Sequence, residues 1–362
     1  MTRGWQITLG GGDGPDTDKG TDADTVTGTG SPRAEFVDID DASLRPATDS
    51  PDTVGDVDVA VTWSSLNYKD ALAFAGNPGV VRLSPLVPGI DVIGIVTSST
   101  NSRWSVGDRV LLNGAGAGET RHGGLAERAV LDGDTLVATP SAFTDAHAAG
   151  IGTAGFTAML AVLALERHGV TPAADAVVLV TGASGGLGSF AVALLSRAGF
   201  TVTAATGSPE SEARLRQLGA TNVVDRAEFD RDSRALESQR FVGVVDSVGG
   251  RMLATALAQL RHGGAAVACG NAASPHLPTT VMPFILRGVA LLGVNSTLTP
   301  LALREQAWAR LADDLDPAIV DAIAQPIELA AARDSAADLL AGRLTGRVSV
   351  HVGGEFEEAS SL

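Results

Sequence analysis

Residues 176–208, AVVLVTGASGGLGSFAVALLSRAGFTVTAATGS, combine an aliphatic run, a glycine cluster, a helical pattern and a second apolar run in direct succession. The run Val177–Val180 is typical of a strand that is buried on both faces of a parallel sheet. The glycines of 182–188 lack Cβ atoms, so backbone N–H groups can approach a pyrophosphate, whose charge is also favoured by the N-terminus of the next helix. Because these features occur in the required order, they predict a dinucleotide-binding βαβ unit rather than an ordinary flexible turn.

The end of the second strand indicates which dinucleotide is bound. An acidic side chain there binds the ribose 2′-hydroxyl of NAD, but this strand ends in Thr206, Gly207 and Ser208. A carboxylate would repel a 2′-phosphate, so its absence favours NADP. Three downstream arginines are candidate partners for that phosphate: Arg214, Arg216 and Arg226.

Composition restricts the possible classes of protein. A chain of 362 residues with 44% hydrophobic and 19% charged residues has room for two globular domains. Its net charge of −16 argues against nucleic acid or an anionic membrane as a partner. The single cysteine, Cys269, and six scattered histidines predict no metal site. We find no run of 18 apolar residues and no signal-peptide core, and therefore expect a cytoplasmic protein.

The order of periodic segments predicts two domains. Short strand patterns separated by glycine-rich turns fill the first part of the chain and predict a partly open β-barrel. A segment of about residues 10–32, rich in Gly, Asp, Thr and Ser, is expected to be a mobile acidic insertion in a hairpin. Two helices, Ala146–Ala149 and Thr157–His168, lead into a doubly wound α/β region. We therefore predict one domain from residues 1–145 and 297–362, and a nucleotide-binding domain from 146–296 inserted into it.

Seven separated motifs carry a family resemblance from about residue 55 onward: WSSLNYKDALA, PLVPGID, GGLAE, GTAGFTAML, VTGASGGLGS, LPTTVMPFILR and the closing TGR. They resemble the zinc-free medium-chain dehydrogenases/reductases, and within them the YhdH/YhfP-type quinone oxidoreductases, now understood as acrylyl-CoA reductases that use NADPH. The resemblance implies a GroES-like, partly open β-barrel catalytic domain, a Rossmann domain with a doubly wound parallel sheet, and a homodimer. The first 50 or so residues depart from the family pattern.

The resemblance also implies site residues. Tyr68 is expected at the nicotinamide end of the cofactor, and the 2′-phosphate loop holds Ser208 where the family usually has arginine, with Arg226 as a second family arginine. Asn271 replaces a more usual leucine. The full set of expected cofactor contacts is Tyr68, Thr157, Ser184, Gly185, Gly186, Leu187, Thr206, Gly207, Ser208, Arg226, Asn271, Ile285 and Ser296. The polar cluster that matches the family's proposed active site is Asn67, Asp70, Asp91 and Arg347.

A structural interpretation of that polar cluster stands beside the catalytic one. Asn67 and Asp70 could cap a helix that starts near Lys69, and Asp91 with Arg347 could form an ion pair that joins two strands.

The predicted reaction is transfer of hydride from NADPH to the β-carbon of an α,β-unsaturated acyl thioester, of the acrylyl-CoA to propionyl-CoA type, without a metal. Asn67 and Arg347 are chemically suited to polarise the carbonyl, and the proton donor is left open. The alternatives are an NADPH-dependent quinone or enone reductase and a catalytically silent nucleotide-binding protein. A short-chain reductase is disfavoured because no Tyr-x-x-x-Lys pair follows the glycine loop, and a zinc alcohol dehydrogenase because Pro88–Asp91 replaces its Gly-His-Glu. The acyl group and the need for CoA stay undetermined at this level.

Overall fold

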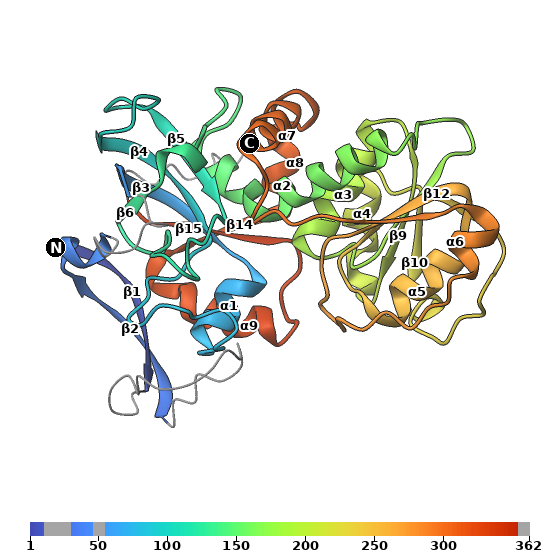
Figure 1. Cartoon of the computed structure of the whole chain (residues 1–362), viewed down its shortest axis with the longest axis horizontal. Helices are drawn as coiled ribbons and strands as arrows, with labels where there is room; N and C mark the ends of the chain where they lie inside the picture. The colour runs from blue at the N-terminus through green and yellow to red at the C-terminus, as the bar shows by residue number, and fades with distance from the viewer. Residues whose placement is uncertain (11–29, 46–54, 354–362) are drawn as a thin grey trace.

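A computed structural model describes residues 1–10, 30–45 and 55–353 of the chain (Figure 1). Near the N-terminus, β1 (Thr2–Gly10) and β2 (Gly30–Ile39) form a two-stranded antiparallel ribbon. Residues 11–29, which contain most of the predicted acidic insertion, lie outside the described part of the chain, so that prediction is not addressed. The ribbon rests on the rest of the protein through Trp5, which is buried and donates from its indole Nε1 to the Leu329 carbonyl at 2.7 Å.

A seven-stranded sheet follows, built from both halves of the sequence in the order β14-β15-β3-β4-β5-β7, with β6 paired to β3. Its central strand β3 (Val57–Leu66) alternates buried and half-buried residues over its first six positions, as expected for a strand with one face on the core. Two helices, α1 (Tyr68–Phe74) and α9 (Ala332–Leu340), pack against each other at one side of this sheet. The other strands are β4 (Asp91–Ser99), β5 (Arg109–Asn113), β6 (Arg128–Leu131), β7 (Val137–Ala138), β14 (Ala324–Glu328) and β15 (Arg347–His351).

The second sheet is fully parallel and has the order β10-β9-β8-β11-β12-β13. This order reverses beside β8, which is the topological switch point where doubly wound sheets bind their ligands. The prediction of a doubly wound parallel sheet is thus confirmed. Its strands are β8 (Val177–Val180), β9 (Thr201–Thr206), β10 (Asn222–Asp225), β11 (Phe241–Asp246), β12 (Leu260–Ala268) and β13 (Ala290–Gly293). Its helices are α3 (Gly186–Arg197), α4 (Glu212–Gln217), α5 (Gly250–Ala258) and α6 (Met282–Arg287).

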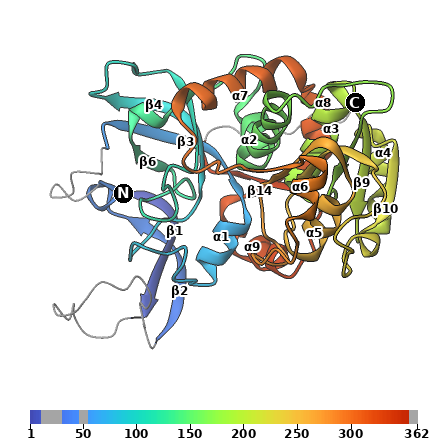
Figure 2. The same cartoon turned by 45° about the vertical axis from the view of Figure 1, so that its right-hand side comes forward.

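Between the two sheets runs α2 (Asp145–Arg167), visible as the long green helix at the centre of Figures 1 and 2. The sequence predicted two shorter helices, and the structure joins them through a kink at Gly152, whose φ of 45° and ψ of −156° are not helical. Helices α7 (Leu301–Asp314) and α8 (Pro317–Ile323) pack on α2. Within the described residues, α2 is the one helix long and apolar enough to cross a bilayer, but 89% of its apolar window is buried inside the protein, as in a core helix.

Candidate active site

The four polar residues of the predicted active site come together where β3, β4 and β15 meet the start of α1. Leu66 pairs with Val348 across the antiparallel β3–β15 ladder, which brings Arg347 beside the N-cap residue Asn67. Asp91 is the first residue of the neighbouring strand β4. All four side chains are buried, with exposed fractions of 9% for Asn67, 5% for Arg347 and 0% for Asp70 and Asp91.

Arg347 uses every N–H of its guanidinium inside the protein. Nε donates to the Gly150 carbonyl at 3.4 Å, and Nη1 donates to the Leu66 carbonyl and to Asn67 Oδ1, each at 2.8 Å. Nη2 donates to Ser65 Oγ at 2.6 Å and to Asp91 Oδ2 at 3.4 Å. Burial lowers the pKa of Arg347 and the carboxylate of Asp91 opposes that shift, so the side chain is held as a buried, charged and fully hydrogen-bonded group.

Asp91 is the acceptor at the centre of the cluster. Its Oδ2 accepts hydrogen bonds from Ser65 Oγ and from Asn67 Nδ2, the latter at 2.9 Å. Its Oδ1 accepts from Asn113 Nδ2 at 2.7 Å and from Thr153 Oγ1 at 2.6 Å, and the Thr153 amide approaches both oxygens at 3.0 Å. Thr153 follows the Gly152 kink, so Asp91 caps the second half of α2 from another strand.

Asp70 forms a capping box with Asn67 at the start of α1. Its Oδ2 accepts from the Asn67 amide at 2.8 Å, and its Oδ1 accepts from the Ile90 amide at 2.9 Å. Burial, followed by the nearby charge of Asp91, raises the pKa of Asp70 to about 7. The structural interpretation of the polar cluster is therefore visible in these contacts, whereas the catalytic roles of the four residues stay predictions.

The glycine loop lies against this cluster. Gly185 is the N-cap of α3 and offers no side-chain cap, which leaves the first amides of the helix available for a pyrophosphate. The Ser184 carbonyl is turned away from that opening, because it accepts from the Gly346 amide and from Arg214 Nη2, both at 2.9 Å. A Cβ on Gly186 would lie 2.3 Å from Cδ of Arg347, so only glycine fits beside the arginine stem. The loop thus has the backbone donors and the close approach that a dinucleotide requires.

The predicted 2′-phosphate end is one hydrogen-bonded turn. Thr206 Oγ1 donates to Ser184 Oγ and accepts from the Ser208 amide, each at 3.0 Å. Of the three candidate arginines, Arg214 is bound to Ser184 and Ser189, and Arg216 to Glu212 and the Thr221 carbonyl. Among the described residues Arg226 has no hydrogen-bond or ion-pair partner for its guanidinium. It lies against Gly207, where an added Cβ would be 2.7 Å from Nε.

The remaining predicted cofactor contacts are more scattered. Tyr68, at the first turn of α1, is 49% exposed, and Ile285 on α6 is 70% exposed. Asn271 is exposed, while Leu187 on α3 and Ser296 after β13 are half-buried. Thr157 is buried in α2 and donates to the Thr153 carbonyl at 2.6 Å. The structure therefore brings Ser184–Leu187 and Thr206–Ser208 together directly, and leaves the roles of the others as predictions.

Four residues that bind within the network were not predicted as site residues: Ser65, Asn113, Thr153 and Arg304. Asn113 ends β5, and its side chain joins Asp91 to Trp308, whose Nε1 donates to Oδ1 at 3.0 Å. Arg304 donates to the Asn113 carbonyl at 2.6 Å and to the carbonyls of Ser296, Thr297 and Thr299. The sequence does not indicate that Arg304 is buried, because an arginine in a helix is usually expected on the surface.

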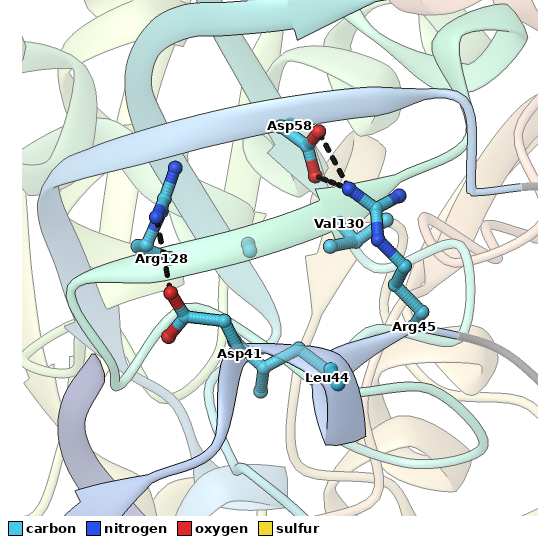
Figure 3. Close-up of a pocket in the computed structure, with 8 residues that line it drawn as sticks. Asp41, Leu44, Arg45, Asp58, Arg128 and Val130 are labelled. Atoms are coloured by element: carbon cyan, nitrogen blue, oxygen red, sulfur yellow. Dashed lines mark hydrogen bonds and ion pairs between the residues drawn. The ribbon is translucent and has the colours of Figure 1, made fainter. Parts of the chain in front are cut away.

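No group of three or more His, Cys, Asp or Glu side chains suited to a metal ion occurs in the described part of the chain. A surface pocket between residues 41–45, β3 and β6 is a separate feature (Figure 3). Its charged side chains pair with one another, Arg45 with Asp58 at 2.8 Å and Arg128 with Asp41 at 3.1 Å. None of the residues that line it belongs to the buried polar cluster or to the glycine loop, so it is not part of the candidate active site.

Comparisons with known proteins agree with this architecture. The family described as "Alcohol dehydrogenase GroES-like domain" matches residues 53–141, and "Zinc-binding dehydrogenase" matches residues 186–313. The acrylyl-CoA reductase AcuI of Ruegeria pomeroyi is 47% identical over 306 residues, which cover 84% of this chain and 92% of that protein. The prediction of a GroES-like domain joined to a Rossmann domain is confirmed. The zinc in the second family's description has no fitting ligand set among the described residues.

Solved structures show similar folds with bound cofactors. The yhdH oxidoreductase of Salmonella enterica in complex with NADP has a TM-score of 0.86 and 43% identity, over 97% of this chain and 100% of that one. The yhfP protein of Bacillus subtilis with NAD bound has a TM-score of 0.85 and 35% identity, over 97% of this chain and 99% of that one.

Proposed function

The chain belongs to the medium-chain dehydrogenase/reductase family, in the group that includes the AcuI, YhdH and YhfP proteins, and from this premise we propose that it reduces the C=C bond of a short α,β-unsaturated acyl thioester with NADPH. The observation that carries the proposal is the junction of the glycine loop with the buried polar cluster. There, Gly186 lies against Arg347 and the Gly346 amide binds the Ser184 carbonyl. This junction would place the nicotinamide end of the cofactor at the catalytic domain.

When bound, NADPH supplies the hydride that adds to the β-carbon of the substrate. The residues of the chain itself bind the cofactor and orient the substrate. The amides at the start of α3 would hold the pyrophosphate, and the turn at Thr206–Ser208 with Arg226 would hold the 2′-phosphate. Negative charge develops on the carbonyl oxygen as the enolate forms. Its stabilisation requires a hydrogen-bond donor that is not already bound to another group of the protein.

Tyr68 has such a donor. It follows Asn67 directly, it is half-exposed, and its hydroxyl has no partner among the described residues. Arg347, by contrast, would have to break an internal hydrogen bond to reach a carbonyl oxygen. We therefore place Tyr68 next to the reacting carbonyl. Tyr68→Phe should lower kcat more than it raises KM, because a donor to the enolate acts mainly in the transition state.

The proposed reaction is tested with a panel of substrates, and turnover of each is measured as the rate of NADPH oxidation. Acrylyl-CoA, crotonyl-CoA, a simple enone and a benzoquinone are compared by kcat/KM at one enzyme concentration. We expect the short thioesters to be the best substrates. Faster turnover of the quinone would favour the alternative function suggested by the name of YhfP, a quinone oxidoreductase that is 40% identical over 315 residues. NADPH binding without turnover of any compound would identify a silent nucleotide-binding protein.

We also propose that the protein is a homodimer that joins through β13 and α6. β13 is an edge strand of the six-stranded sheet, so one side of its backbone is free to pair. Five apolar side chains are exposed beside it: Val281, Met282, Ile285, Leu286 and Leu291. The one charged residue in 281–293, Arg287, is turned inward to the carbonyls of Ala258, Leu260 and Glu237. An uncharged edge on a chain of net charge −16 fits a second copy of itself, related by a two-fold axis.

A further inference from the structure

The start of β15 contacts the glycine loop through two features. The first is the amide of Gly346, which donates to the Ser184 carbonyl in an isolated bridge between Gly185 and Gly346. The second is the arginine stem, whose Cδ and Cγ fill the space that a Cβ on Gly186 would occupy, at 2.3 and 2.8 Å. The start of β15 is therefore fitted to the loop by both backbone and side chain.

The head of Arg347 is held equally firmly from the other side. Its guanidinium reaches Asp91, and Asp91 binds both the Asn113 side chain and the capped half of α2. Asn113 continues the chain of contacts to Arg304 through its carbonyl oxygen at 2.6 Å. Arg304 then binds three carbonyls of residues 296–299, the segment that returns from β13 to the first domain.

These contacts form one path of hydrogen-bonded side chains between the two sheets. It begins at the glycine loop, passes through Arg347, Asp91, Asn113 and Arg304, and ends on the segment 296–299. The two segments that cross from one sheet to the other, α2 with its Gly152 kink and residues 296–299, are both attached to it. A fully hydrogen-bonded buried network of this kind fixes a unique arrangement of the elements that it joins.

We infer that Arg347 is a positioning residue, which holds the glycine loop in its cofactor-binding shape and ties it through Asp91 to both crossings between the domains, rather than a group that touches the substrate. This inference rests on the proposed use of a dinucleotide, but not on the identity of the substrate. Its first readout is therefore the Kd of NADPH, measured by fluorescence without any substrate. Loss of the whole proposed function would appear instead as a native protein that binds no NADPH.

The decisive experiment is a double-mutant cycle between Gly186 and Arg347, with Gly243 on β11 as the control glycine. The nearest atoms to a Cβ on Gly243 would be side-chain carbons of Leu165 and Val178, at an ordinary 3.4 Å. We expect Gly186→Ala to weaken NADPH by about tenfold because it displaces the arginine stem, and Gly243→Ala to change the Kd by less than about threefold. In an Arg347→Ala background the obstructing atoms are gone, so Gly186→Ala should add almost no further loss. An equal loss in both backgrounds would show that the new methyl group obstructs the cofactor itself, and would overturn the inference.

Kinetics provide the second readout. Arg347→Ala should weaken NADPH by about tenfold or more while kcat at saturating NADPH stays within about threefold of the native value. Normal NADPH binding with kcat reduced by about a hundredfold or more would assign Arg347 to the transition state and sink the positioning role. Arg343→Ala, an exposed arginine four residues earlier, should change neither quantity.

Arg347→Ala leaves the buried carboxylate of Asp91 without its cation, and this could unfold the protein. A second variant avoids that outcome. Asp91→Asn/Arg347→Met removes both charges together and retains the bulk of the stem at Gly186. It should bind NADPH within about threefold of the native protein, and Gly186→Ala should again be harmful in it, because the methionine stem occupies the same space. If Gly186→Ala were tolerated in that background, the stem would not be what shapes the loop.

Discussion

The backbone amide of Gly346 donates a 2.9 Å hydrogen bond to the carbonyl oxygen of Ser184, and so links the start of the last strand, β15, to the glycine loop that begins α3. These residues are 162 positions apart, and they adjoin strands of different sheets, β15 and β8. Arg214 binds the same carbonyl from α4 at 2.9 Å. Both acceptor positions of the oxygen are therefore occupied within the protein, and the first amides of α3, which have no side-chain cap, are available for an anion.

Gly346→Ala should destabilise the protein more than its neighbour Gly342→Ala. Both glycines have a positive φ, 73° and 68°, so either alanine costs about 1 kcal/mol or more in backbone strain. Only Gly346 is also crowded, since its Cβ would lie 2.4 Å from the Ile323 carbonyl, whereas the site at Gly342 is open. We expect an additional loss of about 2 kcal/mol for Gly346→Ala. Denaturant unfolding checks this, and equal losses at the two sites would contradict it.

The buried carboxyl of Asp70 should make stability fall as pH rises toward neutrality. Its folded pKa is raised from 3.8 to about 7, so between these values the folded protein holds a proton that the unfolded chain has released. The contribution is fully present below pH 3.8 and is lost as pH rises through about 7. The Tm of the native protein relative to that of Asp70→Asn should therefore fall between pH 5 and pH 8.

An exposed aspartate serves as the control for this effect. Asp338→Asn removes a carboxylate that lies on the surface beside Arg343. Its Tm should follow that of the native protein across the same pH range. If Asp70→Asn tracked the native curve as closely as Asp338→Asn does, the carboxyl would not titrate differently in the two states.

The doubly wound domain could be predicted from sequence because its signals are local. The run Val177–Val180, the glycines after it and the strand up to Thr206 each fit a short window, and all appear in the structure as β8, the loop and β9. The helix α2 was less accessible. Its glycine-rich stretch around Gly152 looks like a break, and what continues the helix is a cap from Asp91, 62 residues away. The edge strand β14 was missed because it is mostly exposed and contains Pro326.

The candidate site, like the fold, could be predicted from the sequence only in part. The resemblance named the right neighbourhood for Asn67, Asp91 and Arg347, since the structure gathers all three. It could not show that the guanidinium is saturated, because its partners lie 197 to 282 residues away in sequence. The residues alone left three candidate arginines for the phosphate, and the resemblance named Arg226. The structure adds that Arg214 and Arg216 are engaged elsewhere.

The proposed dimer should dissociate when like charges are placed on its edge. Leu291→Glu puts a carboxylate on β13, and a two-fold axis would set two such groups close together in an apolar contact. We expect a monomer mass by light scattering. Val106→Glu, at a site on the other domain that is 71% exposed against 38% for Leu291, should leave the mass of the native protein unchanged. A native protein that is already monomeric would remove the dimer from the account.

Removal of metal should leave the reaction rate unchanged. The region PGID at Pro88–Asp91 lacks histidine and cysteine, and the described residues contain no suitable ligand cluster. Dialysis against a chelator, with metal content measured before and after, checks this prediction. A rate that is lost on dialysis and returns with zinc would identify ligands that the present structure does not gather.

Cofactor preference should depend on Arg226. Among the described residues its guanidinium has no partner, and it lies beside Gly207. Ser208 supplies no second positive charge, so we expect NADPH to bind more tightly than NADH through this one cation. A charged hydrogen bond to phosphate is worth about 1.5 to 3 kcal/mol, so Arg226→Ala should weaken NADPH by about tenfold or more and leave NADH unchanged. Arg216→Ala, which removes an arginine already paired with Glu212, is the matched control and should affect neither cofactor.

Ser208→Arg should tighten NADPH by about tenfold and should rescue Arg226→Ala, because either side chain can supply the charge. Binding titrations with both cofactors decide the matter: a loss of NADH equal to that of NADPH in Arg226→Ala would mean that the arginine supports the turn at Thr206–Ser208 rather than the phosphate.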